Sequence, residues 1–207
     1  MEADDRAPGW LLLLAQLPST PSSARVALWR RLRAAGATTL VNSAWVLPRT
    51  APHEEFLGQL RGSVLQQGGI AFVLTIPVSS PEVNETIVAR FQADRAREYD
   101  EFTERCAALL DEIGRESGAG KYTFAEMEED EQDLEKLVRW LAKIQSRDFF
   151  PDERGQQAAA QLARCRSAVE TFSQGVYTAE EVTIPGTSGQ QGADGSDAGE
   201  PDSTQPT

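Results

Sequence analysis

The spacing of hydrophobic residues changes once along this chain, near Pro81, and no other feature limits the fold so strongly. Up to that point, short apolar runs alternate with stretches of helical period. Beyond it, apolar residues return every three or four positions over long stretches, which is the pattern of packed amphipathic helices. Because strands and helices bury different periodic faces, a single element type cannot satisfy both patterns. The sequence therefore predicts two units that meet near Pro81.

The first unit is predicted over residues 9–80 and contains three runs with strand character. "WLLLLAQL" (10–17) and "IAFVLTIPV" (70–78) are continuous apolar runs, which are typical of strands buried on both faces. "TTLVNSAWVLP" (38–48) is rich in β-branched and aromatic residues. It is expected to form a bent strand, or two short strands broken at Asn42-Ser43.

Two helices are predicted between these runs. The first has an apolar stripe of Val26, Trp29 and Leu32, with Leu28 alongside, and ends at Gly36. The second carries its apolar face from Phe56 to Leu65 and ends at the glycine pair that follows. The resulting order, β-α-β(β)-α-β, favours a sheet with its helices packed against it. In about seventy residues, a ferredoxin-like sandwich is the economical solution.

The second unit, residues 81–182, is predicted to be helical throughout. Three amphipathic stripes follow one another, with seam positions Arg95, Tyr99, Phe102, Cys106, Leu109 and Ile113, then Leu134, Leu137, Leu141 and Ile144, then Ala158, Leu162, Cys165, Val169 and Phe172. They predict an antiparallel three-helix bundle or a coiled-coil arm, so the whole chain is α+β. The pattern leaves open whether the helices fold back within one chain or pair between two chains. Residues 1–8 and the acidic tail, 183–207, have almost nothing to bury and are predicted to be disordered.

The net charge of −12 is unevenly divided. Residues 1–81 hold seven basic and five acidic side chains, whereas residues 82–182 hold thirteen basic and twenty-three acidic ones. The run 10–17 is too short to span a bilayer, and it follows acidic residues without a cleavage site behind it. Two cysteines are too few for a disulfide scaffold. No membrane association is expected, and a cytoplasmic location follows.

No catalytic, metal-binding or cofactor-binding set emerges from the sequence, so we expect a non-enzyme. "GRESGAGKYT" (114–123) has five residues where a phosphate-binding P-loop has four, and it reads better as a hinge between helices. Cys106 and Cys165 fall on helical seam positions, where a thiol behaves as a small hydrophobe. The single histidine, His53, stands beside two glutamates at a helix start. A ferredoxin-like nuclease would need a metal-binding acid where Gln16 and Leu17 stand.

The segment "RVALWRRLR" concentrates four arginines, Arg25, Arg30, Arg31 and Arg33, in an acidic chain. One hypothesis is that they form the solvated side of a helix packed on the sheet, since arginine favours helices and its stem covers apolar surface. The other is that they form a basic face that contacts phosphates. The sequence alone leaves both hypotheses open.

Several longer segments resemble a known family. "WLLLLAQLPSTPSSARVALWRRLRAAGATTLVNSAWVLP" and "GGIAFVL" are similar to the N-terminal domain of the ChrB proteins, regulators of chromate resistance. "AREYDEFTERCAALLDEI" and "KIQSRDFFPDERGQQAA" extend the resemblance through the helical region, so that it covers residues 9–182. The helix–glycine–strand portion is also similar to the ferredoxin-like domain of the PaaX repressors.

This resemblance implies a cytoplasmic bacterial protein that contributes to transcriptional control of chromate-efflux genes. It makes Arg25, Arg30, Arg31 and Arg33 candidates for binding operator DNA or the chromate oxyanion. It makes Arg147, Asp148, Phe149 and Phe150 a structural motif that locks the helical region against the sheet. Full-length family members carry a C-terminal domain where this chain has its acidic tail.

The resemblance and the helical seams leave other partners open. A separately encoded protein of the ChrB C-terminal type could supply the domain that the acidic tail replaces, and the chain could form a homodimer. The alternative function is an accessory subunit that binds no DNA and docks a partner through exposed seams of its helical arm.

Overall fold

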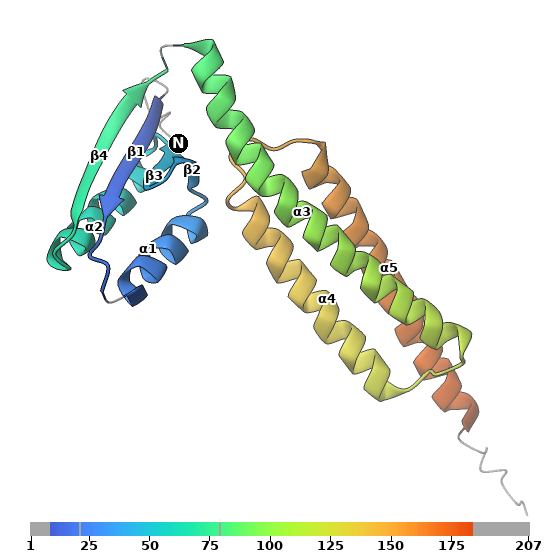
Figure 1. Ribbon diagram of the computed structural model, residues 1–207. Coiled ribbons are helices and arrows are strands. Elements are labelled where there is room, and N and C mark those ends of the chain that lie inside the picture. The colour runs from blue at the N-terminus through green and yellow to red at the C-terminus, as the bar shows by residue number, and fades with distance from the viewer. Residues whose placement is uncertain (1–8, 21, 79, 184–207) are drawn as a thin grey trace, which may run out of the picture.

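The computed structural model describes residues 9–20, 22–78 and 80–183 (Figure 1). Nine elements follow one another along these residues: β1 (Gly9–Gln16), α1 (Ser22–Ala34), β2 (Thr38–Val41), β3 (Ala44–Pro48), α2 (Ala51–Gln66), β4 (Ile70–Pro77), α3 (Pro81–Gly118), α4 (Phe124–Gln145) and α5 (Glu153–Thr183). The predicted α+β order is confirmed, including the break at Asn42-Ser43 that separates β2 from β3. Residues 1–8 and 184–207, for which disorder is predicted, lie outside the described residues.

The four strands form one sheet in the order β2-β3-β1-β4, and every neighbouring pair is antiparallel. Helices α1 and α2 connect strands that run in the same direction with one strand between them, which is the ferredoxin-like arrangement. The β1–β4 register is continuous from Gly9↔Pro77 to Gln16↔Ile70. A register shift interrupts the β2–β3 pair between Thr39 and Val41.

One face of the sheet is covered by α1 and α2. The buried side chains between them are Leu11, Leu13, Leu17, Leu32, Ala37, Leu47, Leu57, Leu60, Val64 and Ala71. Alternate residues of β1 point to this face because side chains of a strand alternate. The buried positions of α2 lie within the predicted apolar face, whereas Leu65 is exposed.

The opposite face of the sheet is covered only in part. Ile87 and Phe91, in the first turns of α3, pack against Trp10 and Val46. The predicted burial of strand 70–78 on both faces is therefore wrong. β4 is an edge strand, and Ile70, Phe72 and Leu74 on this face remain exposed because α3 crosses the sheet on the side of β2 and β3. Ile76, at the other end of β4, is partly buried against the cluster that α3 covers.

The predicted apolar stripe of α1 is also wrong in part. Leu32 is buried, but Val26 and Trp29 are 44% and 53% exposed. The helix packs on the sheet through Leu32 and the predicted Leu28, together with Ala24, and these three residues are spaced four apart. Both sets fit a helical period, and the choice between them depends on how the helix is rotated on the sheet.

Helices α3, α4 and α5 pack together as a three-helix arm (Figure 1). All three predicted seams lie in its interior: every seam position is buried except Leu134, which is partly buried. The helices therefore fold back within one chain, and the seams are not free to dock a partner. The buried face of α3 changes along the helix. Ile87 and Phe91 pack against the sheet, whereas the buried positions from Tyr99 onward pack against α4 and α5.

Short connections turn the chain between these helices. Thr123 caps α4 by accepting a hydrogen bond from the backbone N–H of Glu126 at 3.3 Å. Gly120 has φ 68°, a left-handed conformation that glycine adopts without steric cost. The predicted hinge is thus confined to residues 119–123, and the glycines before it belong to α3. No helix in the described part of the chain is both long and apolar enough to cross a bilayer.

Candidate anion-binding site

The four arginines of α1 have four different surroundings. Arg25 reaches back to the β1–α1 loop and donates to the carbonyls of Pro18 and Ser19 at 3.0 and 2.6 Å. Arg31 lies over the ring of Phe56, 6.0 Å from its centre, and so faces α2. Both side chains stabilise the packing of the sheet unit while keeping their charge near solvent.

The other two arginines point elsewhere. Arg33 makes an ion pair with Asp94 of α3 at 3.0 Å and a second with Glu98 at 3.6 Å. Arg30 is exposed and has no hydrogen bond or ion pair to another described residue. The structure therefore does not gather the four arginines into one cluster.

A groove of about 580 Å³ lies where α1 and the β2–β3 hairpin face α3. Three arginines line it: Arg33 from α1, and Arg90 and Arg97 from α3. We call it the arginine groove. The acidic residue among its lining side chains, Asp94, is held by Arg33 and by the hydroxyl of Thr38, which donates at 2.8 Å. The groove consequently carries a net positive charge.

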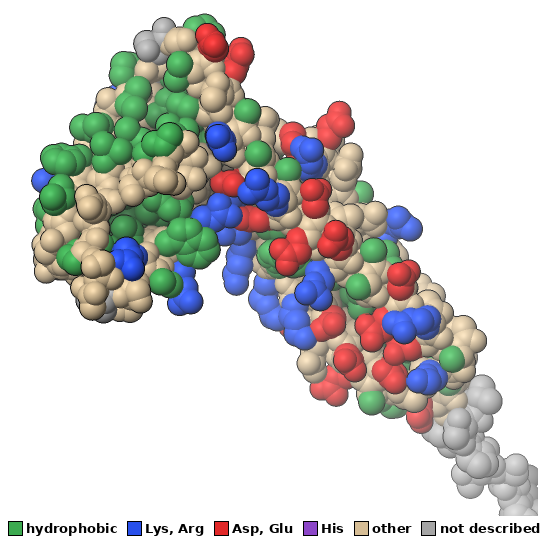
Figure 2. All heavy atoms as spheres, in the orientation of Figure 1, with side chains coloured by type: hydrophobic (Ala, Val, Ile, Leu, Met, Phe, Trp, Pro, Cys, Tyr) green, Lys and Arg blue, Asp and Glu red, His purple; other side chains and the backbone are tan. Residues whose placement is uncertain are grey.

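Aromatic and strained residues complete the arginine groove. Trp29 and Trp45 form part of its wall, and Ser43 sits at the tip of the hairpin with φ 65°, which is uncommon outside glycine. The same three residues also line a neighbouring hollow of about 280 Å³ that includes Arg25. Figure 2 shows basic side chains gathered on the side of the molecule where the sheet unit meets the arm.

Sequence reasoning missed Arg90 and Arg97. They lie seven residues apart, which places them on the same face of α3, and Asp94 lies between them. That spacing could have suggested a shared face. It could not have shown that this face lies opposite α1, because the opposition depends on the packing of α3 against the sheet.

A network of charged side chains lies beside the groove, at the junction of sheet and arm. Arg95 is 3% exposed and donates to Glu98 at 2.9 Å. Burial lowers the pKa of the Arg95 guanidinium, and the charge of Glu98 opposes that effect. Arg147 donates to the same carboxylate at 3.1 Å, so Glu98 bridges α3 and the end of α4.

Arg147, Asp148, Phe149 and Phe150 all lie at this junction. Asp148 accepts a hydrogen bond from the hydroxyl of Tyr99 at 2.8 Å. Burial, followed by that contact, raises the pKa of Tyr99. Both phenylalanine rings lie against Phe91, with ring centres 5.9 and 5.4 Å away. The segment thus contacts the helix that covers the sheet.

The remaining candidate residues have structural surroundings. Cys106 and Cys165 are buried side by side in the arm, where the Cys165 thiol donates to the Cys106 carbonyl at 3.5 Å. Burial raises the pKa of both thiols. His53 is half-buried, with Nδ1 2.8 Å from the carbonyl oxygen of Pro48. Among the residues that the structure describes, no group of His, Cys, Asp and Glu side chains is placed to hold a metal ion.

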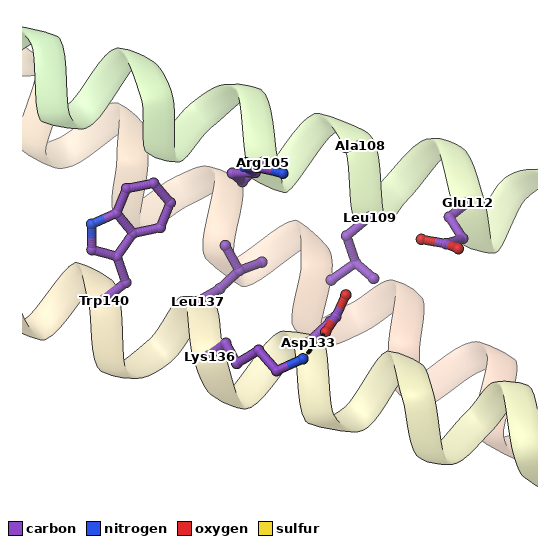
Figure 3. A pocket seen from close by; sticks show the side chains of 8 residues that line it. All are labelled: Arg105, Ala108, Leu109, Glu112, Asp133, Lys136, Leu137 and Trp140. Carbon is purple, nitrogen blue, oxygen red and sulfur yellow. Dashed lines mark hydrogen bonds and ion pairs between the residues drawn. The ribbon is translucent and has the colours of Figure 1, made fainter.

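A second hollow, of about 430 Å³, lies along the arm between α3 and α4 (Figure 3). Its floor is apolar, formed by Leu109 and Leu137, and Trp140 stands at one end. Charges of both signs surround it, and the Lys136–Asp133 ion pair of 2.6 Å lies on its rim. This mixed lining gives no preference for an anion.

Comparison with known proteins identifies the family to which this chain belongs. Residues 25–183 match the family described as "Protein ChrB, N-terminal". The chain is 27% identical over 165 residues to Protein ChrB of Cupriavidus metallidurans. That alignment covers 78% of this chain and 46% of the relative, so the chain spans about half the length of the curated protein it matches. The family match runs from α1 to the end of α5. Because it covers most of the chain, this chain belongs to the ChrB N-terminal family.

Proposed function

We propose that this chain is a non-enzymatic regulatory protein of bacterial chromate resistance, and that its arginine groove binds the phosphates of operator DNA. In this way it contributes to transcriptional control of chromate-efflux genes. The observation that carries the proposal is the convergence of Arg33, Arg90 and Arg97 on one groove with an exposed tryptophan. The family membership supports the regulatory part of the proposal.

The chemistry of the groove suits a chain of phosphates. Arginine binds phosphate through a planar fork of donors, and such contacts supply most of the affinity of DNA-binding proteins. Arg90 and Arg97 are both exposed. The side chain of Arg90 has no hydrogen bond or ion pair to another described residue, and Arg97 contacts Asp94 at 3.8 Å, so both keep donors that a ligand can use. The neighbouring hollow with Arg25 extends the basic surface along α1.

The charge distribution agrees with this location. Residues 9–80 contain six arginines and two glutamates, so the sheet unit is basic although the whole chain is acidic. The arm runs away from the sheet unit, and acidic side chains dominate much of its visible surface (Figure 2). A duplex held at the junction would therefore lie at the basic end of the molecule.

We further propose that Arg147, Asp148, Phe149 and Phe150 fix the arm relative to the groove. The groove is built from α1 and α3, so its width depends on how α3 is held against the sheet. The contacts of this segment with Glu98, Tyr99 and Phe91 support such a positioning role.

The proposal is tested by binding the purified protein to DNA from upstream of its own operon at about 50 and 200 mM salt. The Arg90→Gln/Arg97→Gln variant is compared with Arg139→Gln/Arg164→Gln, which removes the same charge from exposed positions on the arm. We expect the groove variant to lower the slope of log K against log salt by about 2, and the arm variant to leave it unchanged. Scrambled DNA is the control for specificity.

Other outcomes of this experiment would rule out DNA as the ligand of the groove or point to a different ligand. If no DNA binding is detected at low salt, the DNA proposal is wrong. Competition by chromate at concentrations where sulfate has no effect would assign the groove to the oxyanion instead. Loss of binding in both double variants would show a general charge effect rather than a site.

The second candidate function is an accessory subunit that docks a partner protein through its arm. The hollow between α3 and α4 favours it, because a bound helix would cover the partly exposed Trp140 at its end (Figure 3). A partner bound there would be lost on Trp140→Glu replacement, whereas DNA binding would not change.

A further inference from the structure

The free half of the sheet, on the face opposite α1 and α2, exposes an unusual amount of apolar surface. Four large side chains of β1 and β4 lie there: Leu14, Ile70, Phe72 and Leu74, which are 37%, 57%, 56% and 45% exposed. The register pairs Leu14 with Phe72 and Leu12 with Leu74, so they share one face of the sheet. We call this surface the β1/β4 face. In Figure 2, hydrophobic side chains cover the region that β1 and β4 occupy in Figure 1.

The edge strand of this surface, β4, has no charge of its own, and the side chain of Arg61 from α2 covers it at the carbonyl of Ala71. Neither β1 nor β4 contains a charged residue, and the eight residue pairs between them show no bulge. Soluble proteins normally block a long apolar edge strand with a charge, a bulge or a proline inside the strand. β4 has a proline only at its last position, Pro77. Such a strand favours association with another polypeptide.

Among the residues that the structure describes, no element covers this face. Helix α3 crosses the part of the sheet formed by β2, β3 and Trp10. Residues 184–207 follow the end of α5, which lies at the far end of the arm from the sheet (Figure 1). Ile184 is the single large aliphatic or aromatic side chain in that segment. A second copy of the chain can supply the cover, because it carries the same apolar face.

We propose that the β1/β4 face binds the same face of a second copy of this chain, forming a two-fold homodimer. The two sheets would pack about 10 Å apart with their β4 strands antiparallel. The exposed side chains, with Val78 and Val83 just beyond β4, present on the order of 500 Å². Two such faces would together bury on the order of 1,000 Å², which is about the smallest total area of a specific interface.

Charges at the two ends of β4 favour this arrangement. At the first end, Arg61 of α2 donates to the carbonyl of Ala71 at 3.3 Å. At the other end, Glu82 and Glu85 lie in the first turns of α3. An antiparallel two-fold arrangement brings the arginine end of one copy toward the glutamate end of the other. The inference does not depend on the arginine groove binding DNA.

The test is sedimentation equilibrium of the full chain at protein concentrations from about 1 to 100 µM. We expect a dimer for the unchanged protein, and a dissociation constant raised at least about 100-fold by Phe72→Lys or Leu74→Lys, because each change buries an unpaired charge in the interface. Phe124→Lys is the matched control, since Phe124 is 46% exposed at the start of α4. Thermal unfolding of each variant establishes that the fold is retained.

Three results would overturn the inference. The first is an unchanged protein that stays monomeric at 100 µM, the highest concentration in the roughly 1–100 µM range. The second is a dimer that persists in both folded lysine variants of β4. The third is a dimer that Phe124→Lys also dissociates, which would place the interface on the arm.

Discussion

Asp130 lies near the tip of the arm and is 3% exposed, and its Oδ2 atom has no hydrogen-bond partner. Burial raises the pKa of its carboxyl to about 7, and the neighbouring carboxylates of Glu116, Glu112, Glu126 and Asp133 add to that effect. Burial and Glu126 likewise raise the pKa of Glu116. These acids come from α3 and α4, so their repulsion acts across the two helices.

The stability of the arm should therefore depend on pH. The folded-state pKa of Asp130 lies above its ordinary value of 3.8, so the folded state binds the extra proton and is destabilised as pH rises from about 4 to about 7. Asp130→Asn should stabilise the protein at pH 8, by at most about 4 kcal/mol, and much less at pH 4. Urea unfolding at both pH values measures this. The exposed Asp111→Asn control should show no such difference; equal effects of both variants would contradict the assignment.

Trp29 and Leu32 lie three residues apart on α1 but differ in burial, at 53% and 0% exposure. Leu32→Ala should reduce the free energy of unfolding by about 2–5 kcal/mol, since it leaves a cavity in the core. Trp29→Ala should cost about 1 kcal/mol or less, because much of its side chain is already in water. Chemical denaturation of the two variants compares them directly. Similar losses would mean that α1 is rotated on the sheet relative to the structure.

At the scale of elements, the end of α1 approaches the start of the α4–α5 connection closely. Gly36 has φ 80°, and a Cβ atom there would lie 3.0 Å from both the Cβ of Arg147 and the ring of Phe149. Gly68, after α2, has φ 73° but nothing within 4 Å of such an atom. The two glycines share the conformational requirement, and only Gly36 also has the contact.

This pair isolates the contribution of the contact. Gly36→Ala and Gly68→Ala should each lose about 1 kcal/mol from the unfavourable positive φ. Gly36→Ala should lose roughly 1–3 kcal/mol more, as overpacking separates α1 from Arg147 and Phe149. The midpoint of denaturant unfolding measures the difference. Equal losses would show that Arg147 and Phe149 move aside at little cost.

At the scale of the whole molecule, the change in hydrophobic period at Pro81 is also the start of α3, but packing continues across it. Ile87 and Phe91 belong to a buried cluster with Trp10 and Val46 of the sheet. Helix α3 therefore serves both units: its first turns cover the sheet, and the rest forms the arm. A domain boundary at residue 80 would expose that cluster.

Two fragments test this organisation. Residues 1–97 retain Ile87 and Phe91 and should unfold cooperatively, whereas residues 1–80 should not, because Trp10 and Val46 lose their cover. Thermal unfolding followed by tryptophan fluorescence distinguishes them. A cooperative transition in the shorter fragment would support two units that fold independently at Pro81.

The sequence by itself determined the element order, the three arm seams and the break between β2 and β3. These features depend on local spacing, turn residues and capping, which a single segment already contains. For example, Tyr99, Phe102 and Cys106 follow the three-and-four spacing of a heptad repeat. When three helices with this spacing follow each other through short connections, the favourable structure is a bundle in which these positions face inward.

Only the tertiary structure decided which faces meet. It exposed Trp29 and the β1/β4 face, and it brought Arg90 and Arg97 opposite α1, because helix rotation, strand order and the path of α3 depend on contacts distant in sequence. A strand whose residues are all apolar carries no signal of which face will be covered. The candidate groove and the proposed dimer surface both depend on the path of α3, which covers one half of the sheet and leaves the other half exposed.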